Sequence, residues 1–213
     1  MRTKSPVSRT RRSQTVFRPG VFQQGLEYVV GTISSVAFAS GDQFVIGCWQ
    51  QTPVGAMSDV MWLDPSGTRT LIASSEAAAD YITGIYEFDV VKVAELQSSS
   101  CERSTTVVGA GIDLHLRSGR RIRFPGRRPL SITRLVEAPI ARRLMGVEVY
   151  GTTPTGAREW YQASALSWVG AATATIGGED LGSVVDLTRP MGVGFSNPPA
   201  RPSIVSIRVA IQR

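Results

Sequence analysis

The chain's one histidine, His115, lies two positions after Asp113 in a stretch of alternating apolar residues. Residues two apart on a strand project from the same face, where a carboxylate can orient an imidazole for general acid–base chemistry. No Gly-x-Ser-x-Gly elbow supplies a nucleophile for this pair. An enzyme that uses Asp113 and His115 is one candidate function, and a solvated charge pair on a sheet face is the plainer interpretation.

Aromatic rings beside charged groups form a second candidate site. Large apolar rings with a few polar groups are typical of small-molecule sites. We therefore expect Trp62, Trp160 and Tyr161, together with Arg158, to line a ligand pocket. Ordinary β-core packing would use the same residues.

Carboxylate pairs are a further possibility. Glycosidic chemistry would require Asp59 or Asp64 to face Glu159 or Asp113 at a separation of a few ångströms. The sequence does not set that separation, so this interpretation stays open.

Arginines supply a third candidate site, for an anion. Nine arginines and one acid lie between positions 117 and 143. Arg117, Arg121 and Arg123 could bind phosphate groups on one positive face. Because the chain has 21 arginines and only two lysines, codon composition weakens this signal, and we do not favour nucleic acid as a partner.

The net charge of +6 belongs to the start of the chain. Residues 1–18 contain six basic residues and no acid, whereas the remainder has 17 of each sign. This segment lacks apolar periodicity, so we expect residues 1–27 to form a flexible basic arm and 28–213 to form one domain. The polar run 97–106 predicts an exposed loop and is the best candidate for a boundary between sub-lobes.

Metal and cofactor chemistry have little support. One histidine and two cysteines, Cys48 and Cys101, cannot build a structural zinc site or an iron–sulfur cluster, so we expect no metal. Neither Gly109-Ala-Gly nor Gly192-Val-Gly completes a dinucleotide fingerprint, so we expect no cofactor. Lys92 is the one plausible Schiff-base residue and has no supporting signature.

The uncharged stretches do not predict membrane spans. Residues 160–178 lack charge but contain many Ser, Thr and Gly residues, and an export signal after Arg11-Arg12 explains less than a β-hairpin does. Two unpaired cysteines suit a reducing compartment. We expect a cytoplasmic protein with a small-molecule partner and no membrane partner, and we leave the oligomeric state open.

Four segments carry a resemblance to a known family. They begin at Gly41 (GDQFVIGCW), Asp59 (DVMWLDPSGTRTL), Arg158 (REWY) and Pro199 (PARP). Over about residues 28–212 the chain resembles an uncharacterised protein family of high-G+C Gram-positive bacteria. The resemblance implies a bacterial cytoplasmic protein whose basic arm lies outside the shared domain. It brings no activity, so it transfers no functional residue.

The elements that must position these residues are mostly strands. Period-two patterns predict strands near 28–38, 43–51, 58–64, 68–73, 87–96, 106–124, 147–153, 158–169, 171–176, 184–187 and 203–211. Helical spacing predicts a segment near 75–86, which Ser74-Ser75 can cap. It predicts a second near 130–145, with a break or kink at Pro139 and an end at Gly146. Facing apolar residues predict a three-residue turn at 118–120, which would place Arg117 opposite Arg121.

These patterns predict an α+β fold with a predominantly antiparallel, sheet-like or barrel-like β structure and two short helical segments. The repeated Ser-Gly at 66–67 and 118–119 leaves open two similar ββαβ lobes. The preferred function is a small-ligand-binding module with an aromatic-lined β cavity. The enzyme and the anion-binding or nucleic-acid-binding protein are the alternatives.

Overall fold

The computed structural model describes residues 25–125 and 128–213, so most of the expected basic arm lies outside the described residues. The strands are β1 (Leu26–Phe38), β2 (Gln43–Gln51), β3 (Met57–Leu63), β4 (Arg69–Ala73), β5 (Val90–Val93), β6 (Gln97–Ser100), β7 (Ser104–Gly109), β8 (Ile112–Arg123), β9 (Tyr150–Thr152), β10 (Arg158–Ile176), β11 (Glu179–Asp180), β12 (Val184–Val185) and β13 (Ser203–Gln212). The helical elements are α1 (Glu76–Thr83), α2 (Leu130–Ile132), the π-helical turn η1 (Thr133–Glu137) and α3 (Ala138–Met145).

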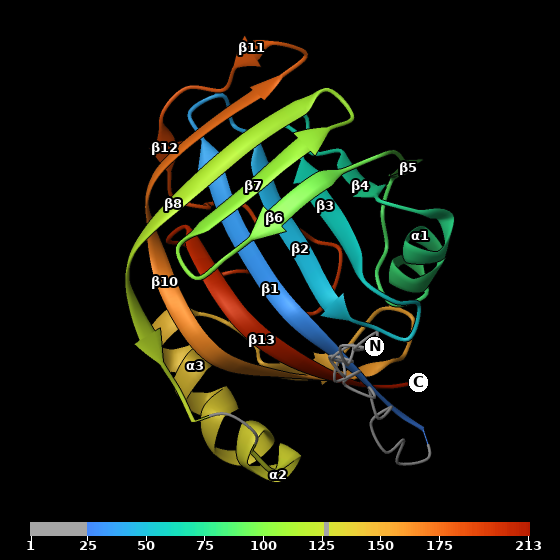
Figure 1. Ribbon diagram of the computed structural model, residues 1–213. Helices are drawn as coiled ribbons and strands as arrows, with labels where there is room; N and C mark the ends of the chain where they lie inside the picture. Colours follow the sequence, from blue (N-terminus) through green and yellow to red (C-terminus); the bar gives the residue numbers. More distant parts are fainter. Residues whose placement is uncertain (1–24, 126–127) are drawn as a thin grey trace, which may run out of the picture.

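The strands form one curled sheet in the order β5-β4-β3-β2-β1-β13-β10-β8-β7-β6 (Figure 1). Every pair along this order is antiparallel except β4 and β5, which run parallel because α1 connects them. The first and last strands, β1 and β13, pair along ten residues at the centre. The predicted antiparallel-rich α+β fold is confirmed.

One face of the sheet is buried because the sheet curls back on itself. Figure 1 shows β6, β7 and β8 crossing over β1, β2 and β3. In the core between them, Phe44 and Ile46 share one cluster with Leu114 and Leu116. A buried hydrogen bond of 2.6 Å joins the hydroxyls of Ser34 on β1 and Thr105 on β7. We call this the closed face.

The other face of β1, β2, β3 and β13 looks toward α1, and we call it the cavity face. The helix begins as predicted, because the Ser75 hydroxyl accepts a hydrogen bond of 3.2 Å from the backbone N–H of Ala78. Its apolar side chains Tyr81 and Ile82 are buried with Leu71 of β4 and Ile207 of β13. Side chains alternate along β2. Even-numbered residues such as Phe44 and Ile46 point to the closed face, and odd-numbered ones such as Trp49 point to the cavity face.

The predicted turn at 118–120 is wrong, because β8 runs through it as one strand. The 19 residues of β10 offer a partner along the whole of β8, with bulges that absorb the change of register. The turn lies earlier, at Gly109, Ala110 and Gly111, which all have positive φ angles. Arg117 and Arg121 are therefore four residues apart on one strand and do not face each other.

Leu114 and Leu116 are buried as predicted, and Asp113 and His115, which alternate with them, are exposed. The segment 97–106 forms β6 and the start of β7, where an exposed loop was expected.

The repeated Ser-Gly is not a repeated turn, since Ser118 and Gly119 lie inside β8. Both predicted ββαβ orders occur along the chain, as β3-β4-α1-β5 and as β7-β8-α3-β9. Their last strands pair differently, because β5 pairs with β4 of its own unit, whereas β9 pairs with β10.

The second helical region does not break at Pro139. Pro139 has no backbone N–H to donate to the carbonyl four residues earlier, and its ring would clash with that carbonyl. The π-helical turn η1, directly before α3, widens the helix at this point and relieves the clash. The helix ends at Gly146 in the left-handed conformation, with φ of 68°, as predicted. None of the helices in the described part of the chain has the length and apolar character needed to cross a bilayer.

Candidate functional site

A cavity of about 500 Å³ lies on the cavity face. Its floor is formed by β1, β2, β3, β13 and β10, and its walls by α1, the helical region 130–145 and the loop 186–202. The lining is mostly aliphatic and includes Val29, Ile33, Val45, Met57, Met61, Ile82, Ile140, Leu144, Met191, Val193, Val205 and Ile207. A volume in this range suits a small organic ligand.

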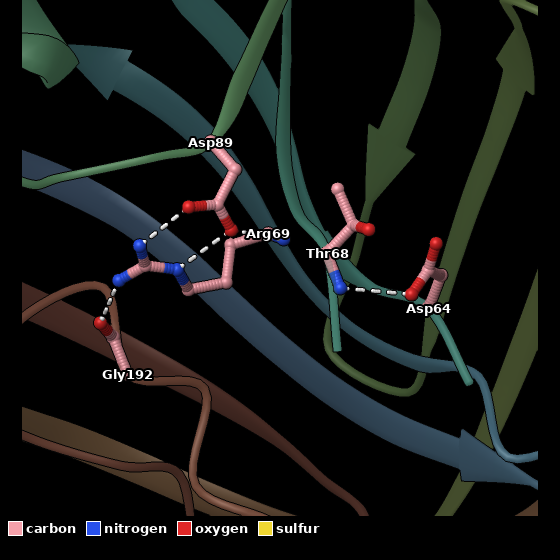
Figure 2. A network of polar contacts seen from close by, with 5 residues as sticks. All are labelled: Asp64, Thr68, Arg69, Asp89 and Gly192. Atoms are coloured by element: carbon pink, nitrogen blue, oxygen red, sulfur yellow. Dashed lines mark hydrogen bonds and ion pairs between the residues drawn. The ribbon is translucent and has the colours of Figure 1, made fainter. Parts of the chain in front are cut away.

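The loop 186–202 is held over the cavity by buried and bidentate polar contacts. Gln43, which is 2% exposed, accepts from the backbone N–H groups of Thr188 and Arg189 and donates to the Arg189 carbonyl at 2.8 Å. In Figure 2 the guanidinium of Arg69 on β4 donates to both carboxylate oxygens of Asp89. It also donates to the Gly192 carbonyl, at 2.7 Å. The same side chain thus ties the start of β5 to the loop that walls the cavity.

The first polar group in the cavity is Asp59 of β3, which is 2% exposed. Its Oδ1 accepts a hydrogen bond of 2.7 Å from the indole Nε1 of Trp49. Gly47 makes this contact possible, since a Cβ there would lie 2.2 Å from Asp59 Oδ1 and 2.3 Å from Trp49 Nε1. The glycine therefore holds open the space in which indole and carboxyl meet.

The second polar group is Glu159 of β10, which is fully buried. The hydroxyl of Tyr86 donates to it at 2.8 Å and that of Tyr161 at 3.0 Å, and the two hydroxyl oxygens lie 2.7 Å apart. The Tyr86 ring lies where a Cβ on Gly194 would be, at 2.7 Å, and Phe195 stacks on Tyr161. Packing therefore fixes the direction in which Glu159 points.

Both carboxyl groups are harder to ionise than free ones. Burial raises the pKa of Asp59 to about 6, against the opposing effect of the Trp49 hydrogen bond. Burial likewise raises the pKa of Glu159 to about 7, although the two tyrosine hydroxyls stabilise its charged form. Burial raises the pKa values of Tyr86 and Tyr161 well above their usual range, so both remain hydrogen-bond donors at neutral pH.

Of the predicted ligand-pocket residues, the structure brings Tyr161 to the cavity and places the other three elsewhere. Trp62 lies on the closed face, where it stacks on Phe44 and donates to Asp42 at 2.7 Å. Trp160 packs against Tyr150, and Arg158 is exposed at the start of β10. Neighbouring residues on a strand point in opposite directions. Glu159 and Tyr161 therefore point into the cavity, and Arg158 and Trp160 point away from it.

The predicted acid–base pair lies on the surface. His115 Nε2 lies 2.8 Å from Asp113 Oδ1, with side chains 51% and 53% exposed. Neither residue lines the cavity. Of the weighed carboxylates, Asp59 and Glu159 share the cavity, whereas Asp64 and Asp113 do not line it.

The predicted anion-binding arginines are divided. Arg121 and Arg123 border a shallow surface hollow with Trp168 and Arg201, and both lie within 4 Å of Glu102. Arg117 is exposed on β8 and does not border this hollow.

The residue types that could bind a metal or form a Schiff base were also located in the structure. Within residues 25–125 and 128–213, no three His, Cys, Asp or Glu side chains gather as a metal-binding group. Lys92 is exposed on β5 and does not line the cavity.

Sequence reasoning missed Trp49 and Tyr86 and did not assign Asp59 or Glu159. A signal was present in the strand parity. Glu159 shares its side of β10 with Tyr161 and with Ala157 directly before the strand. Asp59 shares its side of β3 with two methionines and Leu63. An acid at the apolar positions of an alternating strand marks a buried carboxyl.

No family model and no curated protein matches this chain. Among solved structures, an acetoacetate decarboxylase from Legionella pneumophila subsp. pneumophila aligns over 95% of both chains, with 7% identity and a TM-score of 0.43.

Proposed function

We propose that the protein binds a small, mainly hydrocarbon molecule in this cavity and recognises a hydrogen-bond-donating or cationic group on it. The observation that carries the proposal is the joint presence of Asp59 and Glu159 in a mostly apolar cavity of about 500 Å³. Burial disfavours the charged form of both carboxyl groups in spite of the hydrogen bonds they accept, so their presence in a preformed cavity fits recognition of a ligand group that pairs with them.

The sign of the ligand's charge follows from the lining. Above their raised pKa values, Asp59 and Glu159 place negative charge inside the cavity. Arg128 also lines it but is paired with Glu137. A ligand ammonium or hydroxyl group would be stabilised by these carboxyls, whereas a ligand carboxylate would be repelled.

Decylamine, decanol and decanoate test this preference with one hydrocarbon chain and three head groups. Trp49 is the indole that lines the cavity, so binding should change its fluorescence. At about pH 8 we expect decylamine to bind at least about tenfold more tightly than decanoate, because one buried charge contact exceeds the 1.4 kcal/mol that a factor of ten requires. Equal affinities for all three would contradict carboxyl recognition.

Two indole variants provide the control. W49F should abolish the fluorescence response to decylamine, whereas W168F should retain it, because Trp168 lies under Arg201 away from the cavity. Native mass spectrometry of the purified protein would identify a co-purifying molecule directly. A response that survives in W49F and vanishes in W168F would refute binding in this cavity.

A further inference from the structure

The helical region 130–145 exposes apolar side chains to solvent where an ordinary surface helix is polar. The exposed fractions are 40% for Ile132, 70% for Leu135, 50% for Val136, 52% for Ile140 and 76% for Leu144. Ile132, Val136, Ile140 and Leu144 follow one another at intervals of four residues, and Leu135 lies three residues after Ile132, so the five share one side of the helical region. We call them the apolar stripe. A contiguous exposed row of large aliphatic residues marks an interaction surface.

The stripe adjoins the opening of the cavity. Ile140 and Leu144 belong to the stripe and also line the cavity. The exposed Phe124 and Met145 line the cavity as well but are not part of the stripe. Figure 1 shows the end of β8 leading toward α2 and α3, which lie beside β10. A surface that covers the stripe therefore lies next to the cavity contents.

The charges around the stripe are basic. Arg134, Arg142 and Arg143 lie in the same helical region, whose one acid, Glu137, turns inward to an ion pair with Arg128. Just beyond α3, Glu148 lies 3.1 Å from Arg142, whose side chain stays 74% exposed, so the three arginines outnumber the one acid at this surface. A row of aliphatic residues flanked by arginines is the pattern of a helix that lies in the interface of an anionic bilayer. A second copy of the chain would bring these arginines against each other, which disfavours self-association through the stripe.

We propose that the apolar stripe docks on an anionic membrane surface and turns the mouth of the cavity toward the lipid. The docking extends the proposed function. It depends on that function only for the identity of the molecule that the cavity holds. The expectation of no membrane partner came from the absence of spanning segments, and a helix that lies flat needs no span.

Vesicle sedimentation of the full chain tests the docking. We expect binding to vesicles of phosphatidylcholine mixed with phosphatidylglycerol, and L135S/V136S should lower the bound fraction at least about fivefold by removing apolar area. R142Q/R143Q should weaken binding to the same vesicles about tenfold. The matched controls V54S/V91S and R103Q/R117Q change exposed residues outside the stripe and should bind as the wild type does.

Three outcomes would overturn the docking. Undiminished binding by L135S/V136S would assign vesicle affinity to the basic residues 1–18, which that variant retains. Equal binding to vesicles of pure phosphatidylcholine would remove the role of the arginines. A wild-type dimer that becomes monomeric in L135S/V136S, measured by light scattering, would show that a second copy covers the stripe.

The docking and the ligand site fail separately. Leu135 and Val136 do not line the cavity, so L135S/V136S should bind decylamine in solution with wild-type affinity. Loss of vesicle binding with decylamine affinity intact supports the docking. Vesicle binding by a protein that binds none of the three decyl compounds would leave the docking standing and refute the proposed function.

Discussion

The buried carboxyl of Glu159 makes stability depend on pH in an unusual direction for an acid. Its pKa of about 7 in the folded protein lies above the ordinary value of 4.5, so the folded state keeps a proton that the unfolded chain releases. The resulting stabilisation is complete below the ordinary value and is lost as the pH rises through about 7. Asp59 adds to this loss over a lower range, because its pKa is raised to about 6.

We therefore expect E159Q to gain stability over the wild type as the pH rises. Glutamine keeps an oxygen for the tyrosine hydroxyls and carries no charge, so the difference in unfolding free energy between E159Q and wild type should grow by roughly 1–3 kcal/mol from about pH 5 to about pH 8. Urea unfolding at both pH values measures it. E179Q removes an exposed carboxylate and serves as the control; the same growth in that variant would exclude Glu159 as the cause.

At the scale of the elements, β2 and β3 build the Asp59 site through a missing side chain. Gly47 leaves the space that Trp49 and Asp59 share, and its backbone lies in a regular antiparallel pair with β3. G47A should lower the unfolding free energy by about 1–3 kcal/mol, because the new methyl group overlaps both atoms of the hydrogen bond.

The measurement is chemical unfolding combined with the emission of Trp49. G119A is the matched control, since a Cβ at Gly119 in β8 would meet nothing within 4 Å. A G47A protein with wild-type stability and emission would show that the indole does not depend on this glycine.

At the scale of the whole molecule, the curl of the sheet decides whether the chain unfolds as one unit. Leu116 of β8 is 1% exposed in the core shared with β1, β2 and β3. L116A should lower the unfolding free energy by about 2–5 kcal/mol, the usual cost of a core cavity. Because the ribbon of β6, β7 and β8 shares this core, tryptophan emission and circular dichroism should report a single transition.

V108A on the neighbouring strand β7 is the control, since Val108 is 42% exposed, and it should change stability by less than about 1 kcal/mol. Two separate transitions in L116A would instead support the predicted sub-lobe boundary near 97–106, where the ribbon begins.

The local patterns of the sequence determined the elements and their buried sides. Alternation predicted most strands, the Ser75 cap and Gly146 end fixed two helix boundaries, and Leu114 and Leu116 were assigned inward with Asp113 and His115 outward. These features depend on neighbours within a few residues, which a sequence displays directly.

Only the tertiary structure decided which segments meet. β8 is continuous because β10, more than thirty residues later, supplies a partner along its full length, and no local turn signal reveals that partner. The cavity likewise joins Asp59 of β3 with Glu159 of β10, and the loop 186–202 with α1. Such contacts arise when a sheet curls and brings distant strands to one face, so the sequence defined the sides of each strand while the fold determined what those sides enclose.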